Sequence, residues 1–78
     1  MDADTQYEIG VMHAQGQVVE KDSVLAHMWF TISASSGNKH AQDRLNELTR
    51  HMNSTQIMKA QAQEKAWRRQ SSNYKNCD

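Results

Sequence analysis

The sequence has no proline, a single cysteine and no long apolar run. Without proline, the commonest helix breaker is missing, and the composition suits an all-helical chain. The lone Cys77 excludes an internal disulfide and fits a reducing compartment. The lack of an apolar run of about 18 residues predicts that no helix spans a membrane. The acidic N-terminus has no signal-peptide core, which predicts a cytoplasmic protein unless the chain is a processed or truncated secreted form.

Aromatic and apolar residues are also few, at 6% and 37% of the 78 residues, and the mean hydropathy is −0.90. A chain this short forms one domain and buries about two-thirds of its unfolded surface. Small domains are often completed by disulfides, a metal or a partner chain. The four histidines (His13, His27, His40 and His51) do not offer the three or four convergent ligands of a zinc site. We therefore expect no metal and no cofactor, and a partner chain instead.

Charge is balanced overall, with nine basic and nine acidic residues, but it is divided along the chain. Residues 1–43 contain two basic and six acidic residues, a net charge of −4. Residues 44–75 contain seven basic and two acidic residues, a net charge of +5. Such a division occurs in proteins that contact nucleic acid or a membrane surface, and it equally suits an antiparallel or head-to-tail contact between two copies.

Four helices are predicted from apolar residues that recur with helical spacing. They cover about residues 4–15, 23–36, 39–51 and 53–69. Their candidate N-caps are Asp4, Asp22, Asn38 and Asn53, the last with Gln56 in a capping-box spacing. The connections are short, so consecutive helices are expected to form antiparallel hairpins. Residues 70–78 have no periodicity and are expected to be disordered.

The second of these helices is expected to be the central one. Leu25, Met28, Trp29 and Ile32 form an apolar stripe at i, i+3, i+4 and i+7. Further apolar residues widen the stripe to more than half of the helix circumference. Gly16 is expected to end the preceding helix, because glycine adopts the left-handed backbone conformation of a helix C-terminus at the lowest energetic cost.

An internal repeat relates the first half of the chain to the second. A shift of 36 residues places Ile9 on Leu45 and Met12 on Leu48. A period of about 36 residues with two helices per unit is typical of helical solenoids. The stretch YEIGVMHAQGQVVEKDSVLAHMWFTISASSGNKHA then resembles a Sel-one-like repeat, a relative of the tetratricopeptide repeat. The matching positions are Ile9-Gly10, the loop 16–19, Asp22, Ala26, Trp29-Phe30, Ala34, Gly37 and Ala41.

The resemblance implies an all-α fold of four helices in two antiparallel α/α hairpins, a fragment of a tetratricopeptide-like solenoid. Residues 1–4 would be a tail, 5–40 the repeat, 41–69 a second, degenerate or capping helix pair, and 70–78 a C-terminal tail. The chain departs from the family pattern at Thr5, His13, Val18 and Ser33. Val18 replaces a loop glycine, and because a β-branched residue resists positive φ, the loop must take another conformation.

The same resemblance implies a non-catalytic scaffold or adaptor that binds a protein or a peptide. In such folds the first helix of each pair lines a concave face, so the outward residues of those helices are candidate partner-binding residues. These are Gln6, His13, Gln42 and Thr49. A homo-oligomer is also expected, because one full repeat leaves apolar residues under-covered. The candidates for self-association are Trp29, Ile57, Met58 and Trp67.

Other classes of function have weaker support in the sequence. The basic segment 59–75 has Arg68 and Arg69 beside Trp67, which makes nucleic-acid binding the alternative, although the neutral total charge disfavours it. No Ser–His–Asp order and no phosphate-binding glycine loop is present. Cys77 has no histidine beside it in the sequence. We therefore expect no enzymatic activity.

Overall fold

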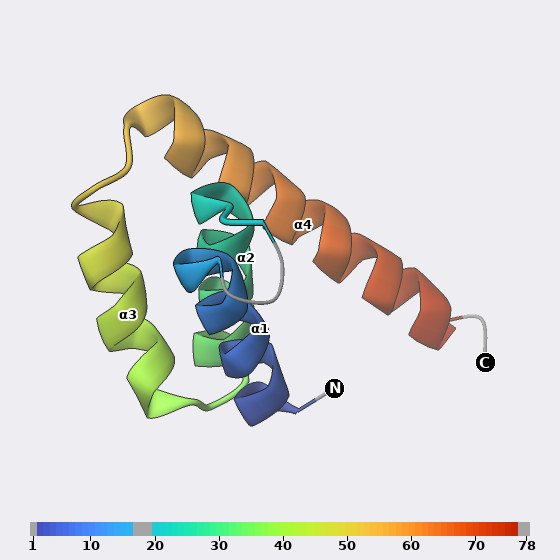
Figure 1. Cartoon of the computed structure of the whole chain (residues 1–78). Helices are drawn as coiled ribbons and strands as arrows, with labels where there is room; N and C mark the ends of the chain where they lie inside the picture. The colour runs from blue at the N-terminus through green and yellow to red at the C-terminus, as the bar shows by residue number, and fades with distance from the viewer. Residues whose placement is uncertain (1, 17–19, 77–78) are drawn as a thin grey trace.

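The computed structural model describes residues 2–16 and 20–76, with side chains as far as Gln70, and it is all-helical over these residues. Four helices follow one another along the chain (Figure 1): α1 (Ala3–Gln15), α2 (Ser23–Ser35), α3 (Lys39–Thr49) and α4 (Ser54–Asn76). The predicted fold class and number of helices are confirmed. Val18 and Cys77 lie outside the described residues.

Helix α2 is the centre of the fold, as its wide apolar stripe predicts. Each of the other three helices packs against it (Figure 1). Its buried residues include Ala26, Phe30 and Ile32, each at most 1% exposed. The largest share of the core therefore comes from one helix that is covered on several sides.

The second predicted hairpin is open. Helix α3 and α4 follow each other through a short connection, but both make their main contacts with α2 rather than with each other. Figure 1 shows the two helices diverging from this connection. The expectation that α3 and α4 pack as a closed antiparallel pair is therefore wrong for the described residues, because α4 docks on α2.

Polar side chains begin the helices as the sequence predicts, with one exception. The carboxylate of Asp22 accepts from the backbone N–H of Leu25 at 3.0 Å, and Asn38 caps α3 in the same manner. Asn53 and Gln56 exchange side-chain-to-backbone bonds of 2.8 and 3.0 Å, which is a capping box. The exception is α1, whose N-cap is Asp2 and not Asp4.

Asp2 takes the cap because its carboxylate accepts from the N–H of Thr5 at 2.7 Å, and this bond lowers the pKa of Asp2 below its ordinary value. Asp4 instead lies in the first turn and accepts from the side-chain amide of Asn38 at 3.1 Å. The interaction ties the N-terminus of α1 to that of α3. Asp4 therefore has a tertiary role in place of the expected local one.

Helix ends differ from the expected positions in α3 and α4. Gly16 ends α1 with φ 70°, as predicted, and its N–H bonds to the carbonyl of Met12. Helix α3 ends at Thr49, two residues early. Helix α4 runs to Asn76, beyond the end expected near Arg69, so the backbone of the expected tail is helical as far as Asn76. The segment from Gln70 to Asn76 contains neither glycine nor proline, which permits this continuation.

A close contact between α1 and α2 explains why Gly10 lies inside a helix. A Cβ atom at this position would lie 2.7 Å from two ring carbons of Phe30. The close neighbour of Gly10 is thus an aromatic side chain of α2. Nearby, the Ser33 hydroxyl donates to the carbonyl of Ala3 at 2.6 Å and links the same two helices.

Candidate functional site

A hollow of about 120 Å³ lies between α1 and α3, and the Phe30 ring of α2 forms part of its lining. Three apolar residues from three different helices line it: Ala14, Phe30 and Leu48. The polar lining residues are Arg44 and Glu47 of α3 and His51, which follows the end of that helix. The hollow thus has an apolar part that reaches the core and a charged rim on one helix. We call it the α1–α3 groove.

Tyr7 joins the two walls of the α1–α3 groove. The Nε of Arg44 donates to the Tyr7 hydroxyl oxygen at 3.2 Å. The Tyr7 ring also lies 5.8 Å from the ring of Phe30 and 6.4 Å from that of His40, measured between centroids. These contacts fix the guanidinium of Arg44 at the rim, because its Nε is committed to a phenol that is itself packed on the core.

A second, more polar hollow of about 410 Å³ extends the groove along the outer side of α3. It shares Glu47 and His51 with the α1–α3 groove and adds Asp43, Asn46 and Arg50. Together with Arg44, the rim offers two acidic side chains, Asp43 and Glu47, and two basic ones, Arg44 and Arg50, on α3 and its C-cap. A surface of this kind can form hydrogen bonds and ion pairs of either sign, and it has no excess of one charge.

The groove combines a small apolar space with hydrogen-bond donors and acceptors at its rim. Among the described residues, no three His, Cys, Asp or Glu side chains converge as metal ligands. Likewise, no helix of this part of the chain is long and apolar enough to cross a membrane. What the groove offers is a small apolar space beside paired donors and acceptors, an arrangement typical of sites that accept one side chain of a ligand.

The four partner-binding residues predicted from the sequence are not gathered in this groove. Gln6 is 2% exposed, so the expectation that it faces outwards is wrong. His13 and Thr49 are half-buried, and the hydroxyl of Thr49 donates to the carbonyl of Asn46 at 2.9 Å. Of the four, Gln42 alone is exposed, and its amide donates to the Asn46 side chain at 3.0 Å.

The residues that line the groove were not predicted as site residues, because their sequence pattern is also that of ordinary helix packing. Leu48 has the helical spacing of a core residue and was assigned to packing alone. Arg44, Glu47 and His51 recur at i, i+3 and i+7, a spacing that also occurs on an ordinary solvated helix face. Their spacing places them on one side of the helix, but only the position of Tyr7 and Phe30 shows which side faces the groove.

The four residues predicted for self-association divide into two groups. Trp29 and Trp67 pack on each other within the chain, with ring centroids 6.0 Å apart at an interplanar angle of 69°. Ile57 is half-buried on α4, whereas Met58 is 67% exposed. Met58 is thus the only one of the four that stands mainly in solvent.

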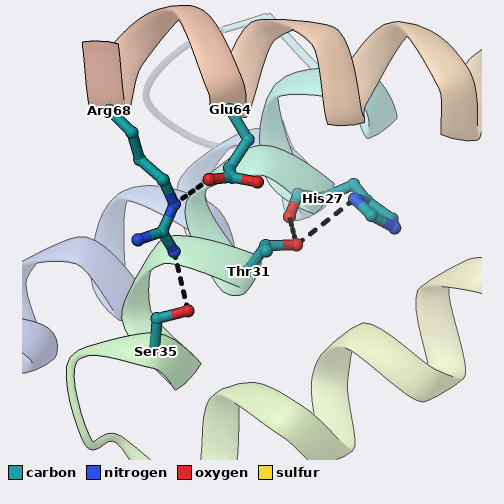
Figure 2. A network of polar contacts seen from close by, with 5 residues as sticks. All are labelled: His27, Thr31, Ser35, Glu64 and Arg68. Carbon is teal, nitrogen blue, oxygen red and sulfur yellow. Dashed lines mark hydrogen bonds and ion pairs between the residues drawn. The ribbon is translucent and has the colours of Figure 1, made fainter. Parts of the chain in front are cut away.

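Polar side chains complete the contact between α2 and α4 (Figure 2). Arg68 pairs with Glu64 one turn earlier on α4, and its Nη2 donates to the Ser35 hydroxyl of α2 at 2.7 Å. On α2, the Thr31 hydroxyl donates to the carbonyl of His27 at 2.9 Å and lies 3.5 Å from its Nδ1. Arg68 is therefore engaged in the fold, which removes one cation from the basic segment considered for nucleic acid.

His27 gives the fold a pH dependence. Its side chain is buried, with 6% of the residue exposed, and burial lowers its pKa below the ordinary 6.5. His27 therefore binds a proton more tightly in the unfolded chain than in the folded chain. The free energy of unfolding then falls as the pH drops below 6.5. We expect a lower melting temperature at about pH 5.5 than at about pH 7.5.

His27→Gln, which carries no titratable ring, should reduce this difference in melting temperature. His40→Gln is the matched control, because it also replaces a histidine with glutamine, but at an exposed position. An unaltered pH dependence in His27→Gln would contradict the role assigned to His27.

Comparison with known proteins returned no match to a family model, to a curated protein or to a solved structure. The function is therefore inferred from the geometry of the groove and of the helix faces.

Proposed function

We propose that the chain is a non-catalytic protein–protein interaction module whose α1–α3 groove binds an extended or helical segment of a partner protein. The observation that carries the proposal is the groove itself, with its apolar part formed by Ala14, Phe30 and Leu48 and its charged rim on α3. The sequence resemblance to Sel-one-like repeats supports the same class of function. A cytoplasmic adaptor or scaffold is the role that fits this class.

The size and lining of the groove define the kind of segment that would bind. A hollow of about 120 Å³ accepts one aliphatic or small aromatic side chain. Burying such a side chain supplies about 1.5–3 kcal/mol, and the rim residues fix its orientation through hydrogen bonds. A partner segment with one apolar anchor flanked by polar residues is therefore the expected ligand.

Nucleic acid is the alternative ligand, and it would bind on α4 rather than in the groove. The exposed cations of that helix within the described side chains are Lys59, Lys65, Arg68 and Arg69. Arg68 is already paired with Glu64, and the overall charge is neutral. Because binding to phosphates depends on several free cations, the groove is the better supported site.

A displayed library of random peptides selected on the immobilised chain tests the proposal. We expect enriched peptides to share one apolar position and to bind with a dissociation constant in the range of about 1–100 µM. Replacing Leu48 with serine should weaken binding about tenfold or more, because it removes part of the apolar wall.

Two further variants separate loss of the groove from loss of the fold. His51→Glu changes an exposed rim residue and should also alter binding, whereas Gln63→Glu on α4 should not. All variants should keep their cooperative thermal unfolding. Enriched peptides that bind Leu48→Ser and His51→Glu as tightly as the original chain would overturn the groove as the binding site.

A further inference from the structure

The outer face of α4 is an amphipathic surface that nothing in the chain covers. The residues of α4 that turn towards α2 recur with helical spacing and are Ile57, Ala60, Glu64 and Trp67, which are buried or half-buried. The opposite side of the helix consists of Met58, Ala62, Lys65, Ala66 and Arg69, all exposed. This second set, the α4 outer face, combines a 67% exposed methionine with two cations.

Helix α1 has an outer face of the opposite charge. Its buried residues are Gln6 and Gly10, and its other packed side carries Tyr7 and Ala14 towards α3. The exposed residues left over are Asp2, Asp4, Thr5, Glu8, Met12 and Gln15. Met12 is 36% exposed and is the only large apolar residue among them. We call this set the α1 outer face.

When the helices run antiparallel, the acidic residues of α1 and the cations of α4 lie in the same direction from the two methionines. With Met12 opposite Met58, Glu8 lies about 6 Å along α1 and Lys65 about 10 Å along α4, an offset of about 4 Å along the axis that the long lysine side chain can span. Asp2 and Arg69 then meet at about 15 and 16 Å. A parallel arrangement would instead place Glu8 opposite Ser54, the first residue of α4, and Asp4 and Asp2 beyond the end of this helix.

We infer that a second copy of this chain is the occupant: the α4 outer face of one copy docks antiparallel on the α1 outer face of the next. Within one chain, α1 and α4 both turn their packed sides to α2, so their outer faces point away from the shared neighbour. The two faces are different surfaces, which makes the contact heterologous, or head-to-tail. Such contacts build closed rings or open chains of copies rather than an isologous pair.

Complementary charge and exposed apolar area occur together on the outer faces of α1 and α4. The cations of α4 have acidic counterparts on α1, and each face has one exposed methionine to exclude water between them. The inferred contact goes beyond the proposed function and does not depend on it, because neither face includes a residue that lines the α1–α3 groove.

Sedimentation and light scattering of the full chain test the contact. At about 100 µM in low salt we expect a mass above that of one chain, and a lower mass at about 0.5 M salt, which screens the ion pairs. Met58→Glu and Met12→Glu should each give monomers. Glu8→Lys should weaken association in the same assay, and Gln63→Glu, exposed on another side of α4, should leave it unchanged.

Mixing the two methionine variants distinguishes this contact from a symmetric one. The Met12→Glu chain keeps its α4 face and the Met58→Glu chain keeps its α1 face, so the mixture should form a 1:1 dimer and stop there. A symmetric α4–α4 contact would instead give a Met12→Glu homodimer and no mixed dimer. Either that result or a monomeric original chain at this concentration would overturn the inference.

Discussion

Replacing Trp67 with alanine is expected to lower the free energy of unfolding by about 3 kcal/mol and to release α4 from α2. The ring of Trp67 on α4 packs edge-on against the ring of Trp29 on α2. Helix α4 has its main contacts with α2 alone, so little else holds it in place. The value lies at the lower end for a tryptophan because Trp67 is half-buried.

Urea unfolding followed by circular dichroism measures this effect. Met58→Ala is the matched control, since it also shortens a large apolar side chain of α4, but one that is 67% exposed. We expect that control to change stability by less than about 0.5 kcal/mol. If Trp67→Ala and Met58→Ala have equal and small effects, the docking of α4 on α2 does not depend on the tryptophan pair.

Local signals in the sequence were enough to place most helix starts and the centre of the fold. Asp22, Asn38 and the Asn53–Gln56 pair act within three residues of their own position, so their role as caps follows from spacing alone. The wide apolar stripe of α2 likewise depends only on its own residues. Interactions of this range do not require knowledge of which helices meet.

The errors arose where a distant contact decides the outcome. The open arrangement of α3 and α4 depends on Trp67 meeting Trp29, which lies 38 positions away in the sequence. The burial of Gln6 could not be read from an α1 pattern in which Tyr7 and Ala14 look like the core face. Those two residues instead lie beside the groove.

The sequence did not predict the α1–α3 groove. The sequence resemblance indicated a concave face formed by the first helix of each pair, whereas the hollow is lined by Ala14 of α1, Phe30 of α2 and residues 44–51. It did not indicate which residues line it, because His13 and Gln42 are similar in character to His51 and Glu47. The deciding contacts are those of Tyr7 with Arg44 and Phe30. They join three helices, so the sequence pattern of any single helix does not predict them.

The second large effect is expected at Gly10, where alanine should destabilise the chain although it is the better helix former. In an exposed helix, this change is worth about 1 kcal/mol in favour of alanine. Here the new Cβ would lie 2.7 Å from two carbons of the Phe30 ring, which is 1% exposed and packed against Tyr7. Overpacking of a rigid, buried ring costs about 1–3 kcal/mol.

We therefore expect Gly10→Ala to lower the free energy of unfolding by up to about 2 kcal/mol, the overpacking cost less the gain in helix propensity. A double-mutant cycle with Phe30→Leu measures the cause, since leucine lacks the ring carbons that meet the new Cβ. Phe30→Leu should cost less in the Gly10→Ala background than in the original chain. Strict additivity, or a more stable Gly10→Ala variant, would show that the ring moves aside freely. Because Phe30 also lines the α1–α3 groove, a ring that is pushed out of place should weaken peptide binding in the same variant.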